Sequence, residues 1–211
     1  MVNLSYMGAL AKVFTAAPVG FDGSIVEVES DASKGLPSIQ IVGLGNKAID
    51  EAKERVRSAI TNSLLEYPAK KITVNLAPAE LPKDGTHYDL PIALAILLSS
   101  GQLRQSQVEN SLFAGELSLD GSIRPVSGAI SIAEIARNTN ISTVYIPRKN
   151  ASQASLVPGI KIIPVDSLKQ LFLHLKQEQK ISPVTPKILP QKSTYTENTL
   201  DDVLGQEQAK R

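Results

Sequence analysis

Hydrophobic and polar residues alternate over three short stretches near the start of the chain, a pattern typical of strands that bury one face. These stretches are Ala9–Thr15, Ser24–Val28 and Ser38–Val42. From Lys47 the spacing changes to that of a helix, because apolar residues then recur every three or four positions. The face that they form consists of Ile49, Ala52, Val56, Ala59, Ile60 and Leu64. A fourth strand is predicted at Lys71–Asn75.

The stretch Leu90–Leu98 is apolar almost all round a helix, so a helix formed here must be buried. We place Asp89 as its N-cap, with Pro91 in the first turn, where the missing N–H of proline does no harm. The stretch is about half as long as a segment that spans a bilayer. It therefore predicts a core helix and not a membrane anchor.

The region Ser111–Val126 alternates on either side of Asp120-Gly121, which predicts a β-hairpin. The pattern that follows predicts a helix over Gly128–Arg137, strands over Thr143–Ile146 and Gly159–Pro164, and a last helix that Asp166 caps and that ends near Leu175. Strands and helices are interleaved, and a hairpin excludes a purely parallel sheet. The predicted fold class is therefore α+β, or mixed α/β.

The character of the chain changes at Gln177. Residues 177–198 contain Pro183, Pro186 and Pro190, many Lys and Gln residues, and little periodicity, which predicts a flexible linker. A helical pattern returns at Leu200–Arg211. We therefore predict one folded domain over residues 1–176, a linker over 177–198, and the start of another domain over 199–211.

Composition narrows the possible functions. The chain has 22 Lys and Arg residues against 21 Asp and Glu residues, so its net charge of +1 does not demand a polyanionic partner. Aromatic residues make up only 4%, which argues against a surface that stacks single-stranded bases. The absence of cysteine excludes disulfides, thiolate metal sites and a cysteine nucleophile. The first ten residues lack the features of a signal peptide, so we expect a cytoplasmic protein.

The two histidines are the obvious candidates for chemistry. His87 lies in a loop between Asp84 and Asp89, where it could act as a base or a ligand. His174 lies in the last predicted helix without an evident acidic or hydroxyl partner, and we expect it at the surface. A metal site needs three or four convergent ligands, so with two histidines and no cysteine we expect neither a tightly held metal nor another cofactor in this chain.

Three segments, in this order, resemble the proteolytic domain of Lon proteases: Pro82-Lys-Asp-Gly85, Gly115–Val126 and Val144–Asn150. The resemblance covers roughly Lys71 to Leu175. In that family, a serine two positions after the first motif attacks the peptide carbonyl, and a lysine after the turn that follows the second motif is its base. These positions hold His87 and Ile130 here. The resemblance thus implies the Lon-like, ribosomal-protein domain-2-like fold without its catalytic dyad.

Further segments resemble the N-terminal part of the magnesium-chelatase-like AAA+ ATPases of the ComM/YifB family, and with them the resemblance spans nearly the whole chain. They are Ile41–Leu44, Glu51–Ile60, Ile72–Ala79 and Asp89–Leu94. Leu200–Arg211 is similar to the start of that family's ATPase module, just ahead of its nucleotide loop. The resemblance implies that the chain is the N-terminal piece of a longer protein, a hexameric ring that uses ATP and Mg to act on DNA branch points in natural transformation and recombination.

On this interpretation, the chain is a non-catalytic assembly or binding domain, monomeric or weakly associated by itself, that reaches DNA through the longer protein and does not bind membranes. A nucleic-acid contact at Lys83 and Arg124 is a further hypothesis. Two alternatives stay open. One is a divergent hydrolase that uses His87 with Asp84 or Asp89, for which family geometry offers Ser127 and Ser131 as nearby hydroxyls. The other is a magnesium-chelatase subunit that inserts metal into a tetrapyrrole.

Overall fold

A computed structural model describes residues 10–19, 22–42, 47–81, 83 and 85–185. The strands are β1 (Ala11–Val19), β2 (Asp22–Ser33), β3 (Ser38–Val42), β4 (Lys71–Ala77), β5 (Ser111–Phe113), β6 (Glu116–Leu117), β7 (Ile123–Arg124), β8 (Thr143–Pro147) and β9 (Lys161–Val165). The α-helices are α1 (Lys47–Asn62), α2 (Asp89–Ser99), α3 (Ala129–Asn138), α4 (Arg148–Ala154) and α5 (Leu168–Leu175), and a short 3-10 turn, η1, covers Gln105–Gln107.

Seven strands form one mixed sheet in the order β3-β4-β2-β1-β5-β8-β9. The pairs β1–β2 and β2–β4 are antiparallel, and the other four pairs are parallel. The predicted mixed α/β class is confirmed, although the hairpin on which the prediction was based is not the source of the antiparallel pairs in the main sheet. The predicted hairpin is present as β6–β7, but it forms a separate two-stranded sheet, and the antiparallel pairs of the main sheet come from the strands at the start of the chain.

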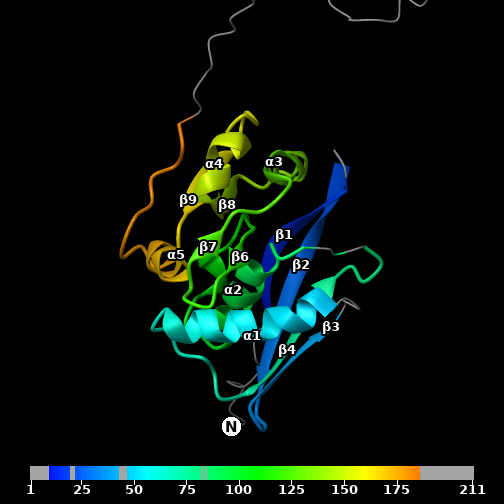
Figure 1. Cartoon of the computed structure of the whole chain (residues 1–211), viewed down its shortest axis with the longest axis vertical. Helices are drawn as coiled ribbons and strands as arrows, with labels where there is room; N and C mark the ends of the chain where they lie inside the picture. The colour runs from blue at the N-terminus through cyan, green and yellow to red at the C-terminus, as the bar shows by residue number, and fades with distance from the viewer. Residues whose placement is uncertain (1–9, 20–21, 43–46, 82, 84, 186–211) are drawn as a thin grey trace, which may run out of the picture.

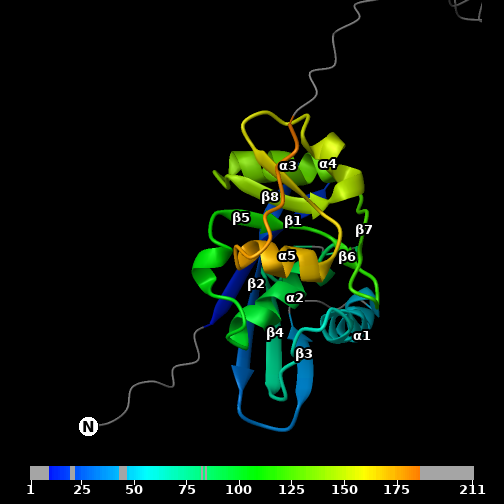
Figure 2. The same cartoon turned by 90° about the vertical axis from the view of Figure 1, so that its left-hand side faces the viewer.

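Helices cover both faces of the sheet, and each face has its own apolar core. The larger core gathers α1, α2 and α5, and the smaller one gathers α3 and α4 (Figures 1 and 2). Strand β8 shows how alternation divides its side chains, because Tyr145 enters the larger core while Val144 and Ile146 enter the smaller one. Residues 89–98 of α2 are all buried, as the apolar pattern predicted.

The ends of two helices differ from the prediction. Helix α2 begins at Asp89 itself, and Tyr88 occupies the N-cap position without a side-chain capping bond. Helix α5 is capped by Ser167, whose hydroxyl oxygen accepts from the N–H of Gln170 at 3.2 Å. The two carboxylates predicted as caps bind arginines of other helices instead, Asp89 with Arg55 and Asp166 with Arg148. A guanidinium is a charged donor and forms stronger hydrogen bonds with a carboxylate than the neutral N–H groups of a helix end do.

The structure adds two features that periodicity did not reveal. Helix α4 has only seven residues, too few to show an apolar stripe. The first part of the predicted linker packs against the domain, because Ile181 is buried and the N–H of Val184 donates to the carbonyl of Ile162 in β9 at 2.9 Å. Residues 186–211, which include the rest of the linker and the predicted ATPase start, lie outside the described residues, as do Gly43 and Leu44 of one family motif.

Candidate functional site

The loop that precedes α2, the β6–β7 hairpin and the start of α3 meet around a cavity of about 450 Å³. Its lining includes Gly85, Thr86, His87, Glu116, Ser127 and Gly128. Two backbone bonds hold the loop to the hairpin, since the N–H of Gly115 donates to His87 at 3.1 Å and the N–H of Leu90 donates back to Gly115 at 3.1 Å. The fold thus brings together the first and second segments that resemble the Lon proteolytic domain.

His87 forms part of the wall of this cavity and is only 6% exposed. Its Nε2 lies 2.9 Å from the carbonyl oxygen of Ala16, which can only accept, so Nε2 carries the proton. Burial lowers the pKa of His87, and the bond to Ala16 opposes this shift. The imidazole is therefore neutral at neutral pH, with its N–H engaged by the backbone of β1.

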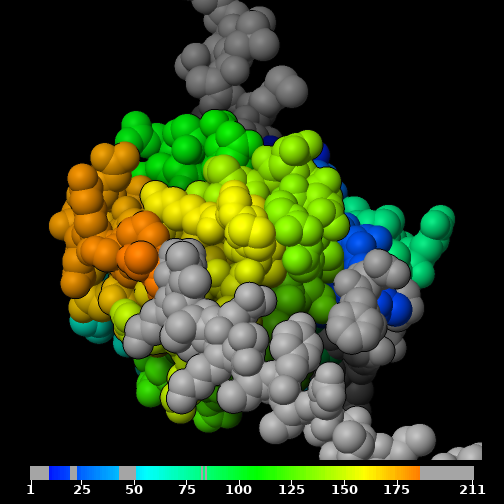
Figure 3. All heavy atoms as spheres, turned by 90° about the horizontal axis from the view of Figure 1, so that it is seen from above, coloured from blue at the N-terminus to red at the C-terminus, as the bar shows by residue number. Residues whose placement is uncertain are grey.

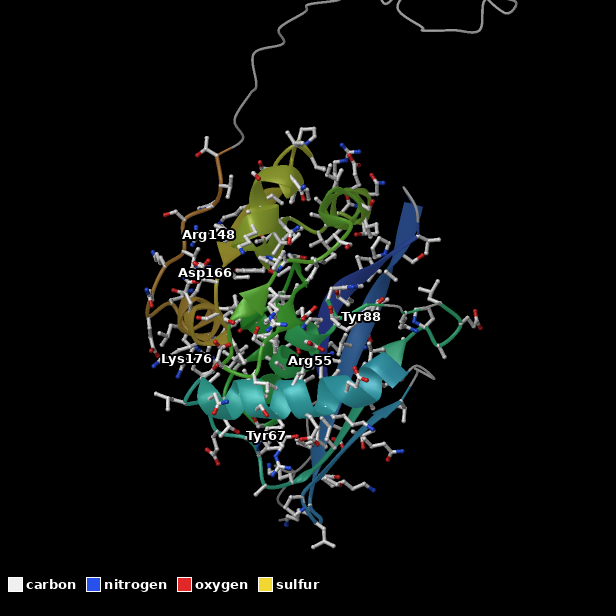
Figure 4. All side chains as sticks on the ribbon, viewed as in Figure 1. Arg55, Tyr67, Tyr88, Arg148, Asp166 and Lys176 are labelled. Carbon is white, nitrogen blue, oxygen red and sulfur yellow. The ribbon has the colours of Figure 1, made fainter. Side chains whose placement is uncertain are left out.

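Asp89 is not the partner of His87. Its carboxylate accepts two bonds from Arg55 of α1, from Nε at 2.8 Å and from Nη2 at 3.1 Å, and a third from the N–H of Leu117 at 3.2 Å. Burial raises the pKa of Asp89, whereas these three donors favour the charged form, so the group stays ionised at neutral pH. The pair ties α1 to α2 and to the hairpin, and Figure 4 shows Arg55 rising from α1 toward the middle of the domain.

The position that corresponds to the Lon lysine is on the outside of the domain. Ile130 is the second residue of α3, is 46% exposed and is not among the residues that line the cavity. An aliphatic side chain cannot accept a proton. Asp84, the other acidic neighbour considered for His87, lies outside the described residues.

Lys83 does not fit the hypothesis of a nucleic-acid contact. Its side chain is buried at 3% exposure, and its Nζ donates to the carbonyl of Pro78 and, at 3.4 Å, to that of Leu81. Burial also lowers the pKa of this ammonium group. The backbone carbonyls hold this ammonium group inside the domain, which argues against a phosphate contact, and the contact at Lys83 stays an untested prediction.

Arg124 does not line this cavity, although its neighbour Pro125 does, and its side chain is accessible. Its side chain is 63% exposed, and its Nη1 lies 3.4 Å from Oε1 of Glu116. Glu116 also accepts a hydrogen bond from the hydroxyl of Thr86, so the carboxylate links the loop to the hairpin. Arg124 is therefore partly neutralised, and its contact with nucleic acid stays a prediction.

His174 has the hydroxyl partner that the sequence did not show. Its Nε2 lies 3.3 Å from the hydroxyl of Tyr145, and its Nδ1 accepts the N–H of Ile181 at 2.9 Å. These groups line a second and larger cavity that the sequence did not predict. The lysines around that cavity come from separate segments, so no single motif marks it in the sequence. The signal that could have pointed to it was the number of basic residues near the end of the domain.

Two other kinds of feature are absent from the described ranges of the chain. These ranges contain no group of three or more His, Cys, Asp or Glu side chains that could hold a metal ion. Among the helices of the same ranges, none is long and apolar enough to cross a membrane.

Comparison with known proteins connects this geometry to named families. A family model described as subunit ChlI of Mg-chelatase matches residues 28–150. The protein YifB of Escherichia coli strain K12 is 41% identical over 203 residues, which cover 96% of this chain and 40% of YifB. The competence protein ComM of Haemophilus influenzae is 39% identical over 206 residues, with the same two shares.

A more distant match is to a Lon protease of Chloroflexus aurantiacus, which is 28% identical over 177 residues, 78% of this chain and 21% of that enzyme. The match is in keeping with the Lon-like fold. The chain spans about 40% of the length of the curated relatives that it matches at high identity.

Proposed function

Because this chain belongs to the family of subunit ChlI of Mg-chelatase, we propose that it is the non-catalytic, Lon-like assembly or binding domain of a longer AAA+ ATPase that remodels DNA. The observation that carries the non-catalytic role is the state of the two dyad positions. His87 is buried and donates to the backbone of Ala16, and Ile130 presents an aliphatic side chain to solvent. Neither residue supplies a hydroxyl nucleophile, and Ile130 cannot act as the base for one.

The motor belongs to the part of the longer protein that this chain does not include. The relatives are about two and a half times as long as the match, which leaves room for an ATPase module. Residues 199–211 resemble the start of such a module. A glycine-rich loop ending in Gly-Lys-Ser/Thr would there hold the phosphates of ATP with backbone N–H groups and meet Mg through its hydroxyl. The natural reading frame beyond Arg211 should encode this loop, and a stop codon there would remove the motor from the proposal.

The DNA substrate rests on family resemblance and on the name of one relative, a competence protein. The test compares the longer protein with a form that lacks residues 1–176, using a branched DNA substrate and ATP. We expect the shorter form to hydrolyse ATP but to lose ring assembly or DNA processing. Equal processing of branched DNA by the two forms would show that this domain serves neither purpose.

The hydrolase alternative has a separate test. We expect the chain to leave unfolded casein and short fluorogenic peptides uncleaved. Turnover that disappears in a His87→Ala variant would establish His87 as catalytic and overturn the non-catalytic role. A metal-insertion subunit would be indicated by stimulation of ATP hydrolysis by a tetrapyrrole and not by branched DNA.

A further inference from the structure

A cavity of about 740 Å³ lies apart from the cavity that His87 lines, and the two share no lining residue. This larger cavity opens between η1, strands β8 and β9, helix α5 and the segment that follows α5. Figures 1 and 2 show that this last segment climbs beside β9 after leaving α5. Four of the side chains that line the cavity are cationic, namely Arg104, Lys161, Lys176 and Lys180, and none of the lining residues is acidic.

The wall formed by residues 180–184 is held in place by the domain. The N–H of Ile181 donates to Nδ1 of His174, and Ile181 itself is buried. Val184 donates to Ile162 and packs on the smaller core, and Figure 3 shows the segment lying against the surface of the domain beside α4. Lys180 is thereby kept at the cavity although it comes after the last helix.

The inner end of the cavity presents a hydroxyl donor. Tyr145 is 7% exposed, and its ring stacks on Phe113 with centroids 4.7 Å apart. Because Nδ1 of His174 accepts from Ile181, Nε2 carries the proton and donates to the oxygen of Tyr145 at 3.3 Å. The tyrosine then has its own proton to donate to a bound acceptor. Burial and the charge of Lys161 lower the pKa of His174, which keeps this imidazole neutral.

Among the described residues, only one of the four cations at the mouth has an acidic partner. Lys176 lies 3.5 Å from Glu178 and over the ring of Phe172. None of the ion pairs found in the described part of the chain involves Arg104, Lys161 or Lys180. In a chain whose net charge is only +1, three uncompensated cations around one cavity are a concentrated positive field.

We propose that this cavity binds phosphate groups, with Arg104, Lys161 and Lys180 neutralising the charge and the hydroxyl of Tyr145 donating to a phosphate oxygen. Several cations at one opening suit a ligand with two or more phosphates, since each cation then meets its own anionic oxygen. Such phosphates occur in a free oligophosphate and in the backbone of a DNA strand. All residues of this site belong to the present chain, so the binding proposed here does not depend on the proposed motor.

The test is a calorimetric titration of the whole 211-residue chain with inorganic pyrophosphate at low salt. A Lys161→Glu/Lys180→Glu variant should bind at least about tenfold more weakly, because two charge-assisted contacts with the phosphates are lost and two like charges replace them. The matched control is Lys70→Glu/Lys71→Glu, which changes the net charge equally at exposed lysines that do not line the cavity. Thermal unfolding of both variants checks that they fold. A Tyr145→Phe variant should lose about threefold in affinity while remaining folded.

A second arm replaces pyrophosphate with a duplex of about 20 base pairs at two salt concentrations, because phosphate contacts make DNA binding salt-dependent. DNA that displaces pyrophosphate and depends on Lys161 and Lys180 identifies the backbone as the source of the phosphates. Pyrophosphate binding without DNA binding identifies a free phosphorylated ligand. The proposal is overturned if neither ligand binds, or if the variant and the control weaken binding equally. None of these results depends on ATP hydrolysis, so failure here leaves the proposed function standing.

Discussion

Replacing Arg55 with methionine removes the cationic partner of the buried carboxylate of Asp89. The substitution keeps much of the side-chain length and removes both hydrogen bonds to the carboxylate of Asp89, at 2.8 and 3.1 Å. Asp89 is 1% exposed, so its charge is then left without a cationic partner in the interior, with only the N–H of Leu117 at 3.2 Å. The side chain of Arg55 is itself only 20% exposed, which means that little water screens the pair.

The expected loss is about 3–5 kcal/mol of unfolding free energy, because breaking a buried ion pair by removing one partner leaves an uncompensated buried charge. The loss of unfolding free energy is near the lower limit of this range if water enters beside the methionine side chain and solvates the carboxylate of Asp89. For a domain of this size, each 1 kcal/mol lowers the melting temperature by about 2–4 °C. The melting temperature should therefore fall by roughly 6–20 °C.

Urea unfolding followed by circular dichroism measures the free energy directly, and a scan at two pH values tests the cause. Without Arg55, desolvation raises the pKa of Asp89 in the folded state further above its unfolded value of about 3.9. A raised pKa means that the folded state binds the proton more tightly, so lowering the pH restores stability. The loss caused by Arg55→Met should accordingly be smaller near about pH 5 than near about pH 8, and adding Asp89→Asn should recover part of it at both values.

The matched control is Arg148→Met at the ion pair between Arg148 and Asp166. That pair has equally good geometry, with contacts of 2.8, 2.9 and 2.7 Å, but its side chains are 54% and 48% exposed. An exposed pair contributes about 0–1 kcal/mol. If the two substitutions cost the same, or if Arg55→Met costs less than about 1 kcal/mol, then burial does not set the value of this contact and the reasoning is refuted.

Three other expectations concern His87, two glycines and the end of the domain. Burial lowers the pKa of His87 in the folded state, so the stability that this residue contributes is present above its unfolded pKa of about 6.5 and is lost as the pH falls. In urea titrations, the unfolding free energy of a His87→Gln variant should therefore decrease less steeply with falling pH than that of the unchanged chain. An equally steep decrease would contradict this expectation. Both Gly101 and Gly121 have φ +83, but a Cβ at Gly101 would meet nothing within 4 Å, whereas one at Gly121 would lie 2.2 Å from Oγ of Ser63. Each alanine variant should lose about 1–2 kcal/mol of unfolding free energy through backbone strain, and the variant at Gly121 should lose about 1 kcal/mol more because of the clash with Ser63. Thermal melts compare the two variants. Equal losses would mean that Ser63 moves freely out of the way. Limited proteolysis should cut first within residues 186–198, the part of the predicted linker that follows the segment held against β9, and a first cut inside the sheet would move the boundary.

Local patterns along the chain were sufficient to place most of the elements. The strand predicted at Ser38–Val42 has those bounds in the structure, and the apolar stretch after Asp89 is the buried helix α2. The Asp120-Gly121 turn of the predicted hairpin has the positive φ at Gly121 that such a turn requires. The motifs also identified the family correctly, as the matches to subunit ChlI, YifB and ComM confirm. These features depend on residues close together in sequence, which is why the sequence alone was enough.

Tertiary structure decided what each charged or polar side chain does. The partner of His87 is Ala16, 71 positions earlier, and the partner of Asp89 is Arg55, 34 positions earlier. Neither follows from local spacing, and for Asp89 the local pattern predicted a helix cap instead. Lys83 has the same sequence character as an exposed basic residue, yet the carbonyl of Pro78 holds it inside.

The basic cavity is the clearest case of a feature that only the fold could create. Arg104 follows α2, Lys161 begins β9 and Lys180 follows α5, and no sequence motif links these three residues. They meet because β5, β8 and β9 pair in parallel and because residues 180–184 attach to β9. The periodicity of a sequence indicates whether a side chain faces the core or the solvent. The neighbours of an exposed charged side chain depend instead on which distant segments lie side by side, and that arrangement is fixed only when the strands pair into a sheet.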